Sequence, residues 1–541
     1  MSAVTAIADE LHQAIFDRFP DWASLVGIPG RDDKLTDYSE AADERFAATL
    51  SDIAGRAEAI DVTGLAKTDR VTRAVILQQT AALRDRVEGR WIEFSVSDLV
   101  LTAVPSLLIS LATMPVDTAA QGEDYLVRLG RLPVFLNTLA RRHRIGVRAG
   151  RLPVARLVRA AIEQLDNQIT TADILCRQPR HTSVVADVVV PAIRAYRTML
   201  ATEVLPHGRD DDHAGVCWLP GGDHLYATAV RDHTTTDRSP DDLHRTGLAV
   251  IAGLAAEYAD IGSRVFGTED LQEIFARLRD DPDLRWRDAE EMIAVAKDSV
   301  SRAEAAAPQW FATLPSAACV TAAYPESTSP GAPPAYLAGT LDGSRPGTYF
   351  VNIHRPEDKV RYEAEAIAFH ESVPGHHLET ALRHERPGLP MLRRTISLTA
   401  YGEGWALYCE RLADEMGLYS GDLARLGMLA MDSMRAGRLV VDTGLHALGW
   451  SRRQAVEYLR VNTPMAPAII ESEVDRYLAC PGQALAYMVG RLEIQRLRRK
   501  AEQALGAGFD IRAFHETVLA EGRMPLSTLA DLVADWIDER T

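Results

Sequence analysis

Apolar residues recur every three to four positions along most of this chain, which is the spacing of amphipathic α-helices. The pattern runs almost unbroken through residues 1–205 and returns in 241–307 and 396–541. Within the first region it predicts helices over 40–60, 70–87, 117–139, 152–176 and 181–204. We therefore predict a mainly α protein.

Two stretches interrupt this helical pattern. After the turn signal Pro220-Gly221-Gly222, residues 228–238 are predicted to form a short strand and a polar loop, and Ser239-Pro240 to begin the next helix. The Pro-, Gly- and Ser-rich segment 325–346 predicts a crossing loop or lid. It leads into 347–354, a run with the composition of a short β-strand.

The length of the chain, 541 residues, exceeds the size at which a single hydrophobic core stops growing. We expect an N-terminal helical lobe over residues 1–205 and a second lobe over 206–541, with the two lobes forming one continuous unit. A large two-lobed helical fold of this kind predicts a deep central cleft, with the small β element beside it.

Charge and cysteine content narrow the expected partners and location. The chain has 59 Lys and Arg against 76 Asp and Glu, a net charge of −17, whereas nucleic acids and anionic membranes are bound by clustered positive charge. The five scattered cysteines form no CxxC pair, which favours a reduced, cytoplasmic location. The amphipathic N-terminus lacks the basic and apolar regions of a signal peptide. The uncharged run 99–116 contains two prolines and four hydroxyl residues, so it predicts buried core rather than a membrane span.

The chemically unusual stretch is 364–382, AEAIAFHESVPGHHLETAL. In the HExxH zinc motif, two histidines lie one helical turn apart and the Glu is the general base. Here the residue four positions after His370 is Pro374. In a straight helix, His376 would lie about 9 Å and His377 about 10.5 Å beyond His370 along the axis. Zinc–nitrogen bonds of about 2.0–2.1 Å exclude that arrangement.

Pro374 and Gly375 suggest how the histidines come together. Proline removes a helical donor and clashes with the preceding turn, and glycine accepts backbone angles that other residues resist. If two residues are looped out, His376 takes the place of the second HExxH histidine, and if three are looped out, His377 does. We therefore expect a distorted helix between Glu371 and His376, with both histidines as candidate ligands.

The sequence HESVPGHHLE resembles the HExxPGHH signature of the domain-of-unknown-function 885 family (DUF885). That family is similar to gluzincin-type zinc metallopeptidases and to the helical peptidases of the thimet-oligopeptidase and carboxypeptidase-Taq groups. The resemblance implies one Zn²⁺ per chain, held by His370, His376 and a Glu on a downstream helix. Glu403 lies 27 residues past His376 and opens a run that ends at Glu410, a spacing like that of the thimet-oligopeptidase group. Glu410 is the alternative ligand, or a partner that fixes a histidine tautomer.

The same resemblance implies roles in catalysis. Glu371 is the candidate general base, which takes a proton from a zinc-activated water and returns it to the leaving amine. The segment 481–490 also resembles the family, and related peptidases place a Tyr after the ligand helix to stabilise the tetrahedral intermediate. This position implies that role for Tyr487, with a half-buried core tyrosine as the alternative. Arg476 and Arg491 flank the segment and are candidates for binding a substrate carboxylate, with structural ion pairs as the alternative.

The predicted strand at 347–354 directly precedes the histidine cluster. A strand in that place could present backbone groups to an extended peptide by β-augmentation. Its residues Tyr349 and Asn352 are therefore candidate substrate-binding residues, and an ordinary structural strand is the alternative.

We predict a zinc-dependent hydrolase that cleaves amide bonds of short peptides, with the catalytic lobe over residues 206–541. One alternative is a metal-dependent enzyme of small-molecule metabolism that acts on a non-peptide amide or imine. Another is a non-catalytic helical binding protein. The expected partner is a short peptide or small amide, without nucleic acid or membrane, and the oligomeric state is left open, with a homodimer among the alternatives.

Overall fold

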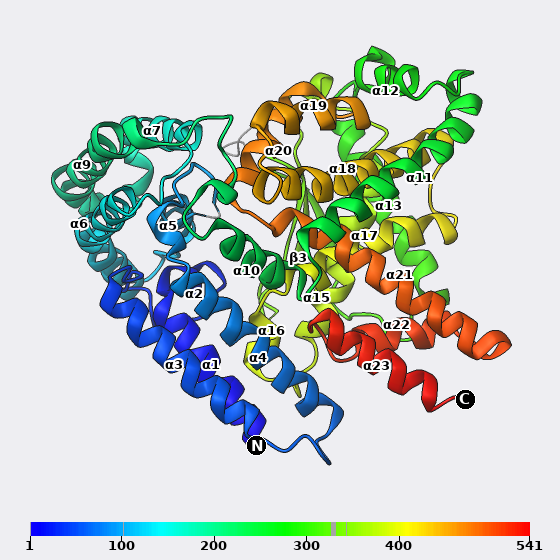
Figure 1. Ribbon diagram of the computed structural model, residues 1–541, viewed down its shortest axis with the longest axis horizontal. Coiled ribbons are helices and arrows are strands. Elements are labelled where there is room, and N and C mark those ends of the chain that lie inside the picture. Colours follow the sequence, from blue (N-terminus) through cyan, green and yellow to red (C-terminus); the bar gives the residue numbers. More distant parts are fainter. Residues whose placement is uncertain (1, 101, 326–331, 342) are drawn as a thin grey trace.

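The computed structural model describes residues 2–100, 102–325, 332–341 and 343–541. The chain is mainly α-helical, as predicted, with one small sheet near its centre (Figure 1). The helices that precede the sheet are α1 (Ala3–Arg18), α2 (Pro20–Leu25), α3 (Glu40–Glu58), α4 (Lys67–Glu88), α5 (Ala103–Thr113), α6 (Ala119–Arg148), α7 (Ala155–Thr170), α8 (Thr182–Val184), α9 (Val190–Met199), α10 (Gly222–Thr234), α11 (Pro240–Phe266), α12 (Leu271–Asp280) and α13 (Ala289–Ala306).

The helices after the sheet extend from the centre to the right of Figure 1, where α11–α13 also lie, and include the predicted metal helix. They are α14 (Ala364–Glu371), α15 (His376–His384), α16 (Met391–Thr395), α17 (Thr399–Glu415), α18 (Asp422–His446), α19 (Arg452–Asn462), α20 (Pro467–Ala479), α21 (Ala486–Leu505), α22 (Ile511–Leu519) and α23 (Leu526–Asp538).

Local signals in the sequence account for the starts and faces of several helices. Ser39 accepts a hydrogen bond from the backbone N–H of Ala42, and α3 then buries Phe46, Leu50 and Ile53 along one face. Ser239 caps α11 in the same way, as predicted. Over the described residues, no helix combines the length and the apolar character that crossing a membrane would require.

The short strand predicted after residue 227 is wrong, because α10 continues through Thr234. The β-branched residues Thr228 and Val230 favour a strand by propensity. In the fold they lie on the buried face of α10, where Val230 packs in one core with Tyr226. Burial of this face therefore outweighs local preference.

The sheet has three strands in the order β1–β3–β2. Strand β1 (Cys319–Ala323) pairs parallel to β3 (Gly347–Val351), and β2 (Ala335–Leu337) pairs antiparallel to it. Both edges of β3 are therefore occupied, so the prediction that this strand accepts a peptide by β-augmentation is wrong. Part of the predicted crossing loop or lid, residues 326–331 and 342, lies outside the described residues, and β2 lies within the remainder of that segment.

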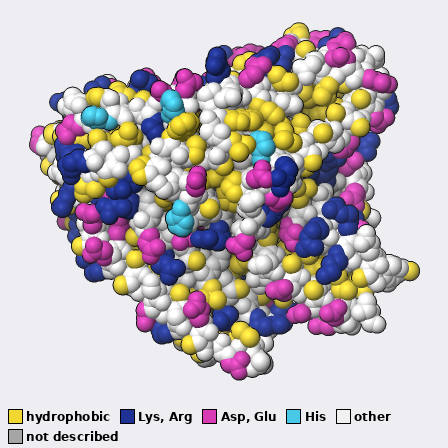
Figure 2. Space-filling view, in the orientation of Figure 1, with side chains coloured by type: hydrophobic (Ala, Val, Ile, Leu, Met, Phe, Trp, Pro, Cys, Tyr) yellow, Lys and Arg dark blue, Asp and Glu magenta, His cyan; other side chains and the backbone are white. Residues whose placement is uncertain are grey.

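Two large hydrophobic cores organise the helices. Helices α5, α6, α7 and α9 pack around a core of their own on the left of Figure 1. In contrast, α1, α3 and α4 share a core with α15, α17 and α21–α23, far along the sequence. The division into lobes at residue 205 stays a prediction. The surface carries interspersed acidic and basic side chains on the face shown in Figure 2.

Candidate metal centre

The predicted helix interruption is present and lies at Ser372–Gly375, between α14 and α15. At Gly375 the chain folds back against the end of α14. A Cβ atom built on Gly375 would lie 2.0 Å from the carbonyl oxygen of His370, a distance that no side chain tolerates. Glycine is therefore required for this close approach, which returns His376 to the level of His370.

Two side chains of α17 bind the interruption and fix the position of that helix. The carbonyl oxygen of Pro374 accepts hydrogen bonds from Trp405 Nε1 (3.0 Å) and from the Cys409 thiol (3.3 Å). Both donors are buried. Because Glu403 lies two residues before Trp405, these contacts place its carboxylate beside the histidines.

His370, His376 and Glu403 meet at one point, with potential ligand atoms that all lie within 4.8 Å of one another. Glu403 Oε2 lies 3.5 Å from His370 Nε2 and 3.3 Å from His376 Nε2. Two imidazoles and one carboxylate form a donor set used by catalytic zinc, which keeps a fourth position open. The residues therefore fit a zinc ion.

His377, on α15, lies apart from this cluster and contacts residues of the sheet region. Its Nε2–H donates to the carbonyl oxygen of Ala317 (2.9 Å), and its Nδ1 accepts from the hydroxyl of Tyr336 (3.1 Å). Both ring nitrogens are thus used. Of the two alternatives that the sequence left open, the structure brings His376 to His370 and Glu403.

Glu410 lies behind His370 and does not enter the cluster. Its Oε1 is 2.8 Å from His370 Nδ1, and the carboxylate is fully buried on α17, seven residues after Glu403. A carboxylate that accepts the Nδ1 proton of a histidine leaves Nε2 free to bind a metal. The position thus matches the second of the two roles predicted for Glu410.

The electrostatics of the cluster favour a positive charge at its centre. Burial disfavours the charged imidazole, but the hydrogen bonds with Glu403 and Glu410 outweigh it and raise the pKa of His370 to about 9. Burial likewise opposes ionisation of Glu403, yet the imidazoles of His376 and His370 hold its pKa well below the usual range.

Glu371, the candidate general base, is the last residue of α14. Its Oε2 accepts the backbone N–H of Tyr336 on the edge strand β2 (2.8 Å). Burial raises the pKa of its carboxyl group above the usual value, and the neighbouring histidines partly oppose this shift. A carboxylate with a raised pKa is suited to accept and return a proton near neutral pH.

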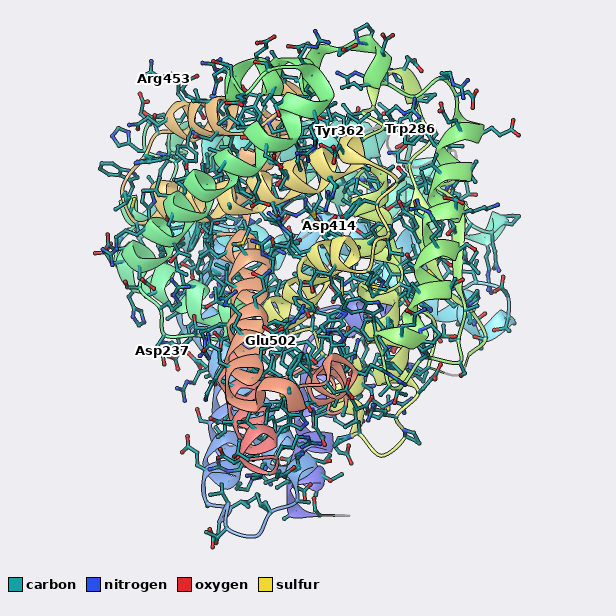
Figure 3. All side chains as sticks on the ribbon, turned by 90° about the vertical axis from the view of Figure 1, so that its right-hand side faces the viewer. Asp237, Trp286, Tyr362, Asp414, Arg453 and Glu502 are labelled. Carbon is teal, nitrogen blue, oxygen red and sulfur yellow. The ribbon has the colours of Figure 1, made fainter. Side chains whose placement is uncertain are left out.

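Tyr487 approaches Glu403 because α17 and α21 cross in direct backbone contact. A Cβ atom on Gly490 would lie 1.9 Å from the carbonyl oxygen of Ala400, and one on Gly404 would lie 2.4 Å from Gly490 Cα. Figure 3 shows α17, marked by Asp414, beside α21, marked by Glu502. Burial and the charge of Glu403 both raise the pKa of the half-buried Tyr487.

The other predicted site residues have protein partners. Arg491 is buried in an ion pair with Asp432. Tyr349 is buried in the central strand β3, and Asn352 is buried beyond that strand, where its amide donates to the carbonyl oxygen of Ala332 (2.6 Å). Arg476 pairs with Glu473 and is the candidate among these four that remains partly exposed.

A cavity of about 520 Å³ lies between the N-terminal helices and the later part of the chain. Its walls include α1, α2 and α4 on one side, and α10 with the segments 396–399 and 479–481 on the other. Thr399 lines it and precedes Glu403 by four residues, or about 6 Å along the axis of α17. The volume falls in the range of small-molecule sites.

Some residues of the site escaped the sequence reasoning. Tyr336 falls in the loop segment, and Arg435 and Arg438 lie on α18 among ordinary helical residues. Their proximity to Tyr487 follows from helix packing, for which the local sequence carries no signal. The glycines Gly404 and Gly490 were the one sequence feature that indicated close contact between the two helices.

Residues 20–533 match the family described as "Bacterial protein of unknown function (DUF885)". The chain belongs to the DUF885 family. A solved structure described as "the putative lipoprotein from Colwellia psychrerythraea" superposes with a TM-score of 0.90 at 26% identity, over 99% of each chain. A second, described as "a putative lipoprotein of unknown function from Shewanella oneidensis", shares the fold with a TM-score of 0.79 at 15% identity, over 99% of this chain and 100% of that chain. None of the curated proteins matches this DUF885 chain.

Proposed function

We propose that this DUF885 protein is a zinc-dependent hydrolase that cleaves amide bonds of short peptides. The observation that carries the proposal is the convergence of His370, His376 and Glu403, from three helices, within 4.8 Å. Beside this donor set lies a carboxylate of raised pKa, Glu371, which is the arrangement that water activation requires. The 520 Å³ cavity near Glu403 favours small substrates over folded proteins.

In this mechanism each residue has a separate task. His370 and His376 would bind the metal through Nε2, and Glu403 through its carboxylate. The bound zinc would supply an activated water and polarise the scissile carbonyl. Glu371 would take the proton of the attacking water and pass it to the leaving amine. Tyr487 would donate its hydroxyl proton in a hydrogen bond to the developing oxyanion.

The experiment combines metal analysis with peptide cleavage. Elemental analysis should find one zinc per chain, and a library of short peptides should be cleaved by the zinc-loaded protein and left intact after treatment with a chelator. His370→Ala should lose both zinc and cleavage. His213→Gln, at a histidine with a half-exposed side chain far from the cluster in the sequence, is the matched control and should keep both.

Two outcomes would support the rival functions instead. A protein that holds zinc but cleaves no peptide would act on another amide or imine, and profiling of small metabolites would then identify the substrate. A protein that binds no zinc would be a helical binding protein. The cytoplasmic location stays a prediction, because the solved neighbours described as lipoproteins lend it no support. Cell fractionation tests it.

A further inference from the structure

Two arginines lie over the ring of Tyr487, and a third binds Gln483, four residues before that tyrosine. The guanidinium carbon of Arg438 lies 4.6 Å from the ring centroid, and that of Arg435 lies 6.0 Å from it. The third, Arg476 on α20, donates from Nη1 to Gln483 Oε1 (2.6 Å), one helical turn before Tyr487. The cluster thus adjoins the residue that faces Glu403.

Within ion-pair distance, these arginines have fewer carboxylates than positive charges. Arg438 and Arg476 share the single carboxylate of Glu473, at N···O distances of 2.8 Å and 3.1 Å. Arg435 lies 3.9 Å from Glu410, which is itself engaged by His370. The shared carboxylate leaves one positive charge of the Arg438–Arg476 pair without a partner.

Burial makes this surplus charge costly for the fold. Arg438 is 4% exposed, and its Nη1 has no hydrogen-bond partner among the described residues. The Nε of Arg435, which is also buried, has none either. Buried N–H groups without an acceptor destabilise the folded protein, so a role in binding an anion explains why the cluster is built this way.

Arg476 is the member of the cluster that a ligand can reach. Its side chain is 20% exposed, and its neighbour Glu473 is 17% exposed. Glu403, whose charge acts on Tyr487, is 23% exposed. Arg476 binds Glu473 through Nε and Nη2, and Arg438 binds the same carboxylate, so one net positive charge remains in the pair for a bound anion.

We propose that Arg476, supported by Arg438, binds the C-terminal carboxylate of the substrate, so that the enzyme removes the last residue of short peptides. The proposal rests on the proposed amide hydrolysis. In a peptide, the C-terminal carboxylate is separated from the last amide nitrogen by a single Cα atom, so an arginine beside the oxyanion residue suits this anion. Guanidinium groups bind carboxylates through paired, charge-assisted hydrogen bonds. Water adds across the last amide bond, giving the shortened peptide and a free amino acid.

The first test compares two substrates of the zinc-loaded wild-type protein that differ at one group. N-acetyl-Leu-Phe with a free carboxylate should be cleaved with a kcat/KM roughly 10- to 100-fold higher than its C-terminal amide, the gain expected of hydrogen bonds to a charged group. Arg476→Gln should abolish this preference, mainly by raising KM for the acid, and Arg476→Lys should restore part of it. Arg460→Gln, at an exposed arginine paired with Glu457, should leave the preference unchanged.

The second test needs no catalysis. In protein stripped of metal, calorimetry should detect binding of the acid and weaker binding of the amide, and Arg476→Gln should remove the difference. Equal cleavage and equal binding of acid and amide would overturn this inference while leaving the hydrolase intact. Cleavage of neither peptide, with preferential binding of the acid retained, would instead count against the hydrolase and in favour of the carboxylate site. A preference that follows an internal Glu over Gln in amidated peptides would assign Arg476 to an acidic side chain and overturn the C-terminal assignment.

Discussion

His143 in α6 and His370 in α14 are both buried histidines, 1% and 4% exposed, yet their surroundings drive them to opposite states. His143 hydrogen-bonds two uncharged groups, the carbonyl oxygen of Glu93 (3.3 Å) and the hydroxyl of Tyr196 (2.9 Å), and burial lowers its pKa to about 4. His370 faces Glu403 and Glu410, which raise its pKa to about 9 against the effect of burial. The carboxylates, and not burial, therefore separate a structural histidine from one prepared for a cation.

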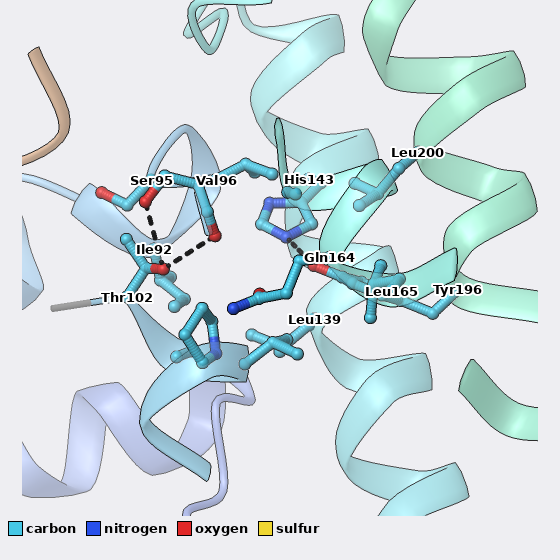
Figure 4. A pocket seen from close by; sticks show the side chains of 15 residues that line it. Ile92, Ser95, Val96, Thr102, Leu139, His143, Gln164, Leu165, Tyr196 and Leu200 are labelled. Atoms are coloured by element: carbon cyan, nitrogen blue, oxygen red, sulfur yellow. Dashed lines mark hydrogen bonds between the residues drawn. The ribbon is translucent and has the colours of Figure 1, made fainter. Parts of the chain in front are cut away.

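The space around the two histidines also differs. His143 lines a cavity of about 10 Å³, which has room for about one water molecule (Figure 4). The centre that contains His370 lies near a cavity of about 520 Å³. Of these two cavities, the second is large enough for a small molecule, and it is lined by Thr399, one helical turn before Glu403 on α17.

The largest expected effect is at Glu371, the carboxylate beside His370 that lies outside the ligand set. Glu371→Gln keeps the shape of the side chain and removes its capacity to accept a proton. Cleavage should fall by roughly 100- to 10,000-fold, the usual contribution of a general base. Zinc content should stay at one per chain, which separates this variant from loss of a ligand, and unchanged cleavage would remove Glu371 from the mechanism.

The pH dependence of the unfolding free energy tests the lowered pKa of His143. In the unfolded chain His143 takes up a proton as the pH falls below about 6.5, whereas in the folded protein it does so near 4. Its contribution to stability is therefore present above pH 6.5 and is lost as the pH falls towards 4. Between these values, wild type should lose about 3 kcal/mol more unfolding free energy than His143→Gln.

The difference between the two proteins is measured by urea unfolding at several pH values. Other buried histidines, such as His446 and His515, add the same kind of slope to both proteins and cancel in the difference. Parallel curves would mean that His143 titrates normally in the folded state. The surroundings of His143 would then not shift its pKa, and the contrast with His370 would fail.

The local sequence predicted helices well where the apolar periodicity and the signals for helix ends point to the same boundaries. Helix α3 begins at Glu40, the predicted start, and the predicted interruption at Pro374-Gly375 separates α14 from α15. Both signals act between residues close in the chain. The short strand predicted within residues 228–238 is wrong because packing in a core with distant residues, and not local propensity, determines that segment.

The choice between His376 and His377 could not be made from the sequence. Looping out two residues or three is equally compatible with this sequence, because Gly375 permits either turn of the backbone. The partners that occupy His377, Tyr336 and Ala317, come from other parts of the chain, as does the carboxylate of Glu410 behind His370. Helix packing brings these groups together, and no short motif encodes it.

A smaller effect is expected when the carboxylate behind His370 is neutralised. Glu410→Gln keeps an oxygen acceptor near Nδ1 but removes the charge, and such partners typically contribute 10- to 100-fold to metal affinity. Competition with a chromophoric chelator should show this loss of zinc affinity. Glu415→Gln, on the same helix and paired with Arg498 at the surface, should bind zinc as wild type does. Equal affinity in both variants would remove Glu410 from the centre.

The smallest effect is expected for the matching change beside His143. Tyr196→Phe removes the hydroxyl that donates to His143 Nε2 and leaves that nitrogen without its partner. The unfolding free energy should fall by about 1 kcal/mol, the net value of one buried hydrogen bond, with zinc content and cleavage unchanged. One partner of each histidine is then changed: Glu410→Gln removes the charge beside His370, and Tyr196→Phe removes the hydroxyl beside His143. If the Tyr196 variant instead lost zinc, the two regions would be coupled through the fold, and His143 could no longer stand as the structural counterpart of His370.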